Sequence, residues 1–139
     1  MPAKPRGACE NCASPLTMNH DPRGRFCSNA CQQEKQFKDY ISKWKAGREV
    51  GGTAHGFVSD YVRRYLKAIR GEKCEVCGWA ERHPVTGLIP LVFDHADGDS
   101  SNHAEENIRI LCPNDHSLTP TYQALNKGRG RAWRRRYGQ

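Results

Sequence analysis

Long apolar stretches are scarce in this sequence. Of its 139 residues, 37% are hydrophobic and 9% are aromatic, and the mean hydropathy is −0.83. No apolar run approaches the roughly 20 residues that a membrane-spanning helix needs, so we expect no membrane partner. The composition also argues against one large hydrophobic core. Small cores of this kind usually depend on a staple such as a metal ion or a disulfide.

A secretory signal is also lacking. Residues 1–7 are charged and proline-rich, without the apolar segment of a signal peptide. The seven cysteines are an odd number, which suits metal ligands better than a set of disulfides. We therefore expect a reducing, cytoplasmic compartment in which the cysteines bind metal.

Acidic residues are fewer than basic ones. The chain has 22 Lys and Arg against 15 Asp and Glu, for a net charge of +7 and an isoelectric point of about 9.2. This excess predicts a polyanionic partner. Basicity alone does not separate DNA from RNA or from an acidic membrane surface.

Four cysteines near the N-terminus form two short pairs. Two residues separate Cys9 from Cys12, and three residues separate Cys27 from Cys31. Two thiol pairs separated by a loop are typical of a tetrahedral zinc site. Because all four positions are cysteine, we expect structural zinc, with four free thiols as the alternative. Ser28 is placed to cap a helix that carries Cys31.

Two amphipathic helices are predicted next. Residues 32–45 place four apolar side chains at helical spacing, namely Phe37, Tyr40, Ile41 and Trp44. Residues 57–70 carry a similar stripe, and Gly71 suits a C-cap. Glycines between residues 47 and 55 predict a flexible connection. Basic residues occupy the other helix faces and are either solvated or in contact with phosphate: Lys35, Lys38, Lys43, Lys45, Arg63, Arg64, Lys67 and Arg70.

The segment from residue 91 to residue 117 has a strand–loop–strand–helix pattern. Residues 90–93 and 108–111 are apolar and β-prone, and a turn-rich polar loop lies between them. Pro113 suits the first turn of a helix, where its missing N–H costs nothing.

This pattern would bring Asp94, His95 and His116 to one end of a small unit. A carboxylate and a neutral imidazole can hold a divalent cation with positions open for water and phosphate. A second imidazole, with a reference pKa of about 6.5, can take a proton from water. The residues therefore predict a metal-dependent phosphodiesterase site.

The combined motif resembles the HNH endonuclease family, which has a ββα-metal fold. It consists of Asp94-His95-x-x-Gly98-Asp99, then Glu106-Asn107, then Cys112-Pro113-x-x-His116. The resemblance extends from about residue 71 to residue 136. Zinc ribbons or treble-clef knuckles precede some phage and bacterial members, as the first cysteine module does here.

The resemblance implies a role for each residue of the motif. His95 is the general base that activates water, and Asp94 and His116 are the ligands of a catalytic Mg²⁺, Mn²⁺ or other divalent ion. Asn107 pins the loop and orients His95. The ion would polarise the phosphate and stabilise the leaving 3′ oxygen. The implied products have 5′-phosphate and 3′-hydroxyl ends.

The remaining polar residues of the loop are interpreted as structural. Asp97 and Asp99 suit loop-shaping turns, with Asp99 kept as an outside candidate for a metal ligand. For His103, a position in a polar loop is explanation enough.

A second cysteine group departs from the family pattern. Cys74, Cys77 and Cys112 supply three thiols, but Asp115 stands where members with a zinc ribbon have a fourth cysteine. Three alternatives follow: Asp115 is itself a ligand, His83 or a water completes the site, or the site has no zinc and is held by packing alone. We favour Asp115, although a site with three cysteines and one aspartate should bind zinc more weakly than four cysteines.

The C-terminal segment is strongly basic and contains no acidic residue. It suits contact with DNA phosphates, with a solubilising tail as the alternative. The candidate DNA-binding residues are Lys127, Arg129, Arg131, Arg134, Arg135 and Arg136.

We expect an α+β protein with four parts. Residues 1–47 form the zinc module with its helix, 48–71 a linker and helix, 72–125 a small ββα-metal nuclease core stapled by zinc, and 126–139 a basic tail. The predicted function is a metal-dependent endonuclease acting on double-stranded DNA as a monomer or homodimer. A phage-encoded protein in a bacterial cytoplasm, and packaging proteins as partners, fit this family. A non-catalytic zinc-containing DNA-binding protein and an RNA-acting nuclease are the alternatives.

Overall fold

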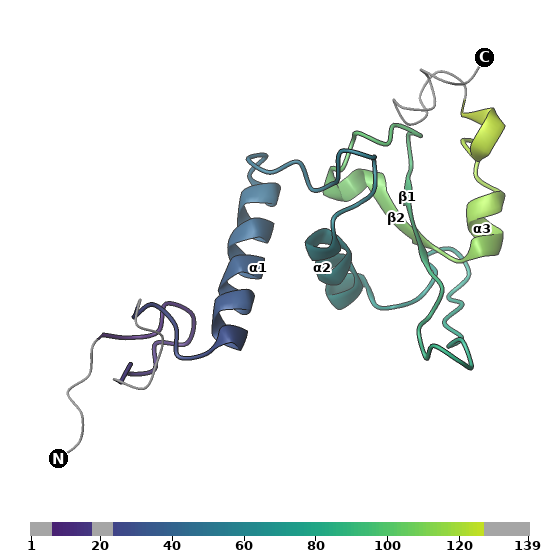
Figure 1. Ribbon diagram of the computed structural model, residues 1–139. Helices are drawn as coiled ribbons and strands as arrows, with labels where there is room; N and C mark the ends of the chain where they lie inside the picture. The colour runs from purple at the N-terminus through teal and green to yellow at the C-terminus, as the bar shows by residue number, and fades with distance from the viewer. Residues whose placement is uncertain (1–6, 18–23, 127–139) are drawn as a thin grey trace. The chain divides into compact units, whose positions relative to one another are not determined.

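The computed structural model describes residues 7–17 and 24–126 (Figure 1). The chain divides into two compact units, residues 1–48 and 49–139. The basic segment predicted to contact DNA, from Lys127 to Arg136, lies outside the described residues.

The first unit contains a cysteine-bearing loop and the helix α1 (Asn29–Lys45). Ser28 caps this helix as predicted, because its hydroxyl accepts a hydrogen bond from the backbone N–H of Cys31 at 3.1 Å. Ile41 and Trp44 are buried on one helix face. A separate small core is formed around the cysteines by Cys9, Leu16 and Phe26, with Cys27 and Cys31 packed against it.

The second unit is built around a two-stranded antiparallel sheet. Strand β1 (Val92–His95) pairs with β2 (Ile108–Leu111), with Asp94 opposite Arg109 and His95 opposite Ile108. Helix α2 (Asp60–Arg70) precedes the sheet and α3 (Pro113–Ser117) follows it (Figure 1). Short 3-10 helices, η1 (Glu105–Asn107) and η2 (Gln123–Leu125), complete this α+β unit.

Most element types agree with the sequence pattern, but several boundaries differ. β2 has the predicted bounds, whereas β1 begins two residues later than expected and includes Asp94 and His95. α2 begins at Asp60 after the N-cap Ser59, so the predicted first turn from residue 57 is not helical. α3 ends at Ser117, and residues 119–122 form turns. Pro120 is unsuited to a helix interior, which explains this early end.

The connection predicted to be flexible forms a hydrogen-bonded turn. The backbone N–H of Thr53 donates to Phe57 O at 2.8 Å, and that of Ser59 donates to Gly51 O at 2.9 Å. Gly52 and Val58 form an isolated antiparallel bridge. Residues 51–58, called the glycine hairpin below, therefore have a defined backbone path before α2.

Arg70 and Glu75 secure the outer edge of β2. The Arg70 guanidinium donates to Ile108 O at 2.6 Å and to Glu105 O at 2.8 Å. The Glu75 backbone N–H donates to Ile110 O at 2.9 Å, and its carboxylate accepts from the N–H of Ile110. The prediction of Arg70 as part of a solvated or phosphate-binding face is therefore wrong, because backbone carbonyls occupy its guanidinium.

Among the described residues, no helix is both long and apolar enough to cross a membrane.

Candidate functional site

The carboxylate of Asp94 and the imidazole of His116 converge at the sheet. Asp94 lies in β1 and His116 in α3, and Asp94 Oδ1 is 3.6 Å from His116 Nε2. The Asp94 side chain is 11% exposed and that of His116 is 30% exposed. Bonds from ligand atoms to a small divalent ion are about 2.0–2.2 Å long, so one ion could contact both atoms. The sequence predicted this pair, and the fold brings it together.

His116 is supported from the segment after α3. The ring of Tyr122 packs edge-on against the His116 ring, with centroids 5.2 Å apart and planes at 90°. The buried Thr119 hydroxyl donates to His116 O at 2.9 Å. These contacts restrict the orientation of the imidazole that faces Asp94.

His95, the last residue of β1, contacts a second histidine. His95 Nε2 and His103 Nδ1 are 3.0 Å apart, and the two rings meet edge-on at 64°. His103 is buried, with 4% of its surface exposed. The expectation that position in a polar loop would explain His103 is therefore incomplete.

Asn107 joins the two ends of the loop between the strands. Its amide nitrogen donates to Asp97 Oδ1 at 2.9 Å and to Asn102 O at 2.8 Å, and its amide oxygen accepts from the Asp97 N–H at 3.1 Å. The Ala96 N–H also donates to Asn107 O at 2.8 Å. Asn107 is buried, so this network pins the loop directly after His95.

Asp97 and Asp99 shape the same loop. Asp97 accepts from the Asp99 N–H at 2.8 Å and from Asn102 Nδ2 at 2.8 Å, while Asp99 accepts from Ser101. Burial raises the pKa of Asp97, but hydrogen bonds from Asn102, the Asp99 backbone and Asn107 outweigh it, so the net pKa is lowered. A carboxylate at Asp97 is thus part of the loop's hydrogen bonding.

Arg109 is a residue that the sequence patterns did not single out. Because it lies opposite Asp94 in the strand register, its Nη2 reaches Asp94 Oδ2 at 2.6 Å. Arg109 thereby occupies one carboxylate oxygen and leaves the other toward His116. Only the alternation of the β2 sequence hinted at Arg109, and cross-strand register cannot be read from one strand alone.

The second cysteine group is assembled with Asp115. Ligand atoms of Cys74, Cys77, Cys112 and Asp115 all lie within 4.8 Å of one another. Asp115 Oδ2 is 3.1 Å from Cys74 Sγ and 3.2 Å from Cys112 Sγ. This donor set fits a cation such as zinc. His83 has a different role, since its Nδ1 accepts from backbone N–H groups of the following turn.

Acidic ligands are crowded at this position. Hydrogen bonds from Cys77, Cys74 and Cys112 lower the pKa of Asp115, while Asp115 raises the pKa of Cys77 to about 12. Without a bound cation, the Asp115 carboxylate therefore disfavours the thiolate form of Cys77. A divalent cation would relieve this competition, because it favours the deprotonated form of every ligand.

The first cysteine group is equally close. Ligand atoms of Cys9, Cys12, Cys27 and Cys31 lie within 4.8 Å of one another. The neighbouring thiols of Cys31 and then Cys12 raise the pKa of Cys27 to about 12. Four converging thiols fit a structural zinc ion.

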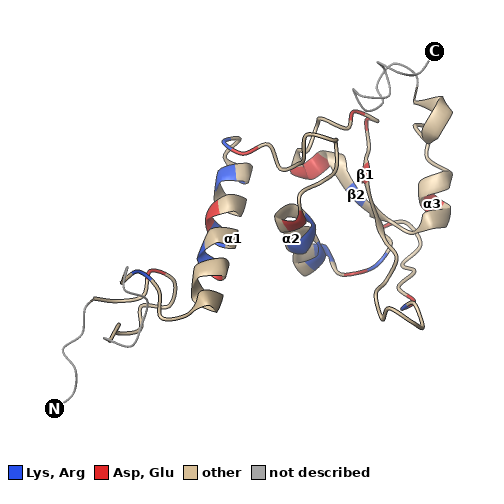
Figure 2. Ribbon diagram, viewed as in Figure 1, with Lys and Arg blue, Asp and Glu red and all other residues tan. Residues whose placement is uncertain are grey.

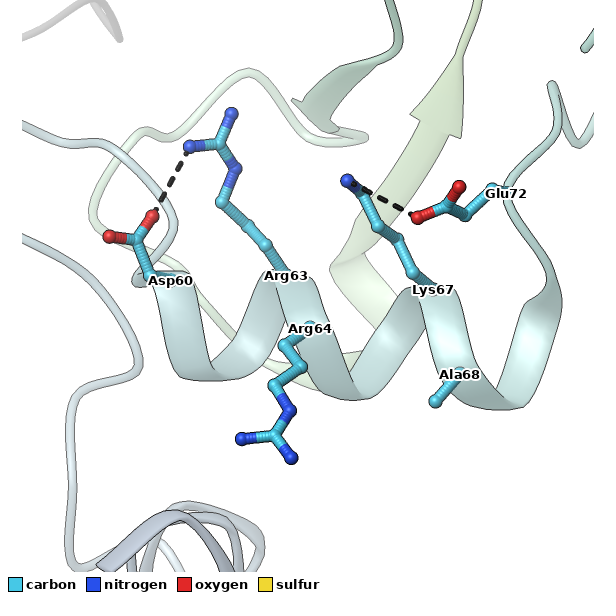
Figure 3. Close-up of a pocket in the computed structure, with 6 residues that line it drawn as sticks. All are labelled: Asp60, Arg63, Arg64, Lys67, Ala68 and Glu72. Atoms are coloured by element: carbon cyan, nitrogen blue, oxygen red, sulfur yellow. Dashed lines mark ion pairs between the residues drawn. The ribbon is translucent and has the colours of Figure 1, made fainter. Parts of the chain in front are cut away.

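A basic depression lies on α2 in the second unit. In Figure 2 the ribbon of this helix is blue at its basic positions, and Figure 3 shows the side chains of Arg63 and Lys67 beside Asp60 and Glu72. Arg63 is 3.5 Å from Asp60, and Lys67 is 3.7 Å from Glu72. The Arg63 guanidinium also lies 5.1 Å from the centre of the Phe93 ring in β1, next to Asp94 in sequence. This face is a candidate for phosphate contact beside the sheet.

Comparison with known proteins identifies a phage nuclease as a relative. The chain is 39% identical over 97 residues to the H-N-H endonuclease F-TflIV of Escherichia phage T5. The match covers 66% of this chain and 40% of the phage protein. No family model matches the chain, and no solved structure matches it. The relationship confirms the resemblance drawn from the motif.

Proposed function

The chain is related to the HNH endonucleases, and from this premise we propose that it is a metal-dependent DNA endonuclease that hydrolyses phosphodiester bonds. The observation that supports the proposal most is the approach of Asp94 Oδ1 to His116 Nε2, at 3.6 Å, with His95 following Asp94 in β1. A carboxylate and an imidazole with open positions next to a further imidazole suit hydrolysis of a phosphodiester.

In the proposed mechanism, Asp94 and His116 hold a divalent ion such as Mg²⁺ or Mn²⁺. His95 takes a proton from the attacking water, and Asn107 keeps the loop after His95 in place. When bound, the ion would polarise the phosphate and stabilise the leaving 3′ oxygen. Both groups of cysteine-based ligands are proposed to hold structural zinc, with Asp115 completing the second.

Binding of DNA is proposed to involve two basic regions. One is the α2 face, in which Arg63, Arg64 and Lys67 line an open depression. The other is the C-terminal segment with Lys127, Arg129, Arg131, Arg134, Arg135 and Arg136. Both would contact phosphates without reading bases, so they give affinity and not sequence specificity.

Cleavage of supercoiled plasmid tests the proposal. Purified wild type, His95→Ala and the exposed control His55→Ala are incubated with EDTA, Mg²⁺, Mn²⁺ or Ni²⁺, and nicked and linear products are separated. We expect ion-dependent cleavage that His95→Ala lowers by about 10²- to 10⁴-fold, which is the usual contribution of a general base. His55→Ala should cleave like wild type, and ligation should reveal 5′-phosphate ends.

Other outcomes would redirect the assignment. Plasmid that is bound and shifted but not cut with any ion would favour a non-catalytic zinc-containing DNA-binding protein. Faster cleavage of a matched RNA at the same salt concentration would favour an RNA-acting nuclease. Cleavage unchanged by His95→Ala would contradict the role of His95.

A further inference from the structure

His103 lies between the proposed general base and the glycine hairpin. It follows β1 by eight residues and has 4% of its surface exposed. Burying a polar ring of this kind is unfavourable unless its nitrogens have partners. His103 Nδ1 has one in His95 Nε2, at 3.0 Å.

The opposite side of the His103 ring faces Gly52. A Cβ atom added at Gly52 would lie 2.0 Å from His103 Nε2, 2.2 Å from Cε1 and 2.3 Å from Cδ2. Any side chain at this position would therefore displace the ring. The backbone at Gly52 is itself fixed by its bridge to Val58 and by the flanking hydrogen bonds of the hairpin.

A second close approach joins the glycine hairpin to the same loop. A Cβ atom at Gly56 would lie 2.9 Å from the side chain of Ser100, and Gly56 has a φ of +79°, which favours glycine. The backbone of the glycine hairpin is thus packed against side chains of the loop between the strands, about fifty residues later in the chain. The His103 ring has little room to rotate between Gly52 and His95.

The consequence concerns the two nitrogens of His95. A neutral imidazole has one N–H donor and one acceptor nitrogen. If Nε2 carries the hydrogen and donates it to His103 Nδ1, then Nδ1 is the basic nitrogen of the His95 ring and the one that can take a proton from water. Burial, followed by the charge of His95, lowers the pKa of His103, with Asp99 opposing. A neutral His103 can act as the acceptor.

We propose that His103 is a positioning residue that fixes the ring orientation and the tautomer of His95, and that the glycine hairpin holds His103 against it. This inference rests on the proposed role of His95 as general base. His103 touches neither the substrate nor the ion in this arrangement. Its effect passes through the hydrogen bond between the two rings.

Three substitutions of His103 separate hydrogen bonding from space filling. The oxygen of Asn lies at about the distance of Nδ1 from the backbone, that of Gln lies nearer the place of Nε2, and Leu fills space without a polar atom. We expect His103→Gln and His103→Leu to lower kcat by about 10- to 100-fold, the usual effect of losing an orienting partner, with KM changed less than about threefold. His103→Asn should keep most of kcat.

Gly52→Ala tests the other side of the ring. We expect it to lower kcat in the same range because its Cβ displaces His103. Zinc content and thermal unfolding of each variant report whether the fold is intact. Gly47→Ala is the control, since no heavy atom lies within 4 Å of a Cβ there. Its φ of +73° makes it the more strained of the two substitutions, because Gly52 lies outside the left-handed region, so strain alone cannot account for a loss seen only at Gly52. Gly47→Ala should leave kcat close to the wild-type value.

Nitrogen NMR of the unsubstituted, zinc-loaded full chain gives a test that does not depend on a variant folding. Two-bond ¹⁵N–¹H correlations assign the ring tautomers. We expect neutral His95 with its proton on Nε2 and neutral His103 with an unprotonated Nδ1. The opposite tautomer at His95 would overturn the proposal.

The kinetic series distinguishes this inference from the proposed function. If His95→Ala abolishes cleavage while folded His103→Gln and His103→Leu cut at the wild-type kcat, the nuclease assignment stands and the role of His103 is wrong. If His95→Ala cuts as well as wild type, the proposed function itself fails and the inference fails with it.

Discussion

Arg109 donates from Nη2 to Asp94 Oδ2 at 2.6 Å, directly across the two-stranded sheet. The contact orients the carboxylate so that Oδ1 lies toward His116. Arg109 thus has two opposing effects on a bound cation. It fixes the geometry of a proposed ligand, and its charge repels the ion.

Substitution of Arg109 should separate these effects. Arg109→Lys keeps the charge but loses the planar guanidinium geometry. We expect the Mn²⁺ concentration for half-maximal cleavage to rise by about 10-fold, within the range for lost orienting partners. Arg109→Met also loses the repulsion, so its increase should be smaller. Titration of Mn²⁺ in the plasmid assay measures both, and a wild-type response from Arg109→Lys would show that orientation by Arg109 is unimportant.

The second cysteine group allows a direct test of its fourth ligand. If each cysteine group holds zinc as proposed, Asp115→Ala should reduce bound zinc to about one ion per chain, because Asp115 lies within reach of the thiols of Cys74 and Cys112. Asp115→Cys should retain zinc longer against a chelator, since thiolate is the softer ligand. His83→Ala should keep both ions. Zinc released to a colorimetric chelator gives the count, and loss of one ion from His83→Ala would reverse the assignment.

Asn107 should contribute to stability as well as to the position of His95. Its side chain is 8% exposed and donates to Asp97 and Asn102. Asn107→Ala should lower the free energy of unfolding by about 1–3 kcal/mol, because buried partners lose hydrogen bonds. Urea denaturation with zinc present measures this loss.

Asn107→Asp is the informative companion. It places a second carboxylate where Asn107 Nδ2 now lies 2.9 Å from Asp97 Oδ1. Repulsion raises the pKa of the introduced carboxyl group, so its charged form costs stability above that pKa. At pH 8 we expect Asn107→Asp to lose more free energy of unfolding than Asn107→Ala. The difference between the two losses should become smaller as the pH falls and the introduced carboxyl group is protonated. Equal losses at every pH would contradict the electrostatic explanation.

Local sequence signals predicted much of this fold. Ser28 and Gly71 mark the start of α1 and the end of α2 as expected, and residues 108–111 form β2. These features depend on a few neighbouring residues. The proposed ion ligands were also predictable, because a short hairpin followed by a helix brings Asp94 and His116 together.

The contacts that were missed depend on residues distant in sequence. Burial of His103 requires Gly52, about fifty positions earlier, to leave its ring space. Helical periodicity predicts Arg70 as a surface cation, because it does not reveal the carbonyls of Glu105 and Ile108 that Arg70 binds. Both contacts form only when segments distant in the sequence pack together, and neither segment by itself has a sequence pattern that predicts the contact.

Phosphate contact at the basic face of α2 can be tested by removing one positive and one negative charge there and comparing the direction of the two effects. Lys67 and Glu72 are 3.7 Å apart and partly exposed, so their ion pair is weak and a phosphate could replace the carboxylate (Figure 3). Lys67→Gln should weaken binding to double-stranded DNA and reduce the slope of log affinity against log salt by about one. Glu72→Gln should strengthen binding, because it removes a negative charge and a competitor for the lysine.

The measurement is fluorescence anisotropy with a labelled duplex, in the His95→Ala background that is proposed to prevent cutting, between about 50 and 200 mM salt. Asp39→Asn on α1 is the matched control for removal of an acid, since Asp39 pairs with Lys35 at 2.5 Å in the other unit. If Asp39→Asn raises affinity as much as Glu72→Gln, the effect comes from net charge and not from the α2 face. Opposite shifts from Lys67→Gln and Glu72→Gln, larger than that of the control, would support phosphate binding at α2, because only a local partner responds to the sign of each charge at that position.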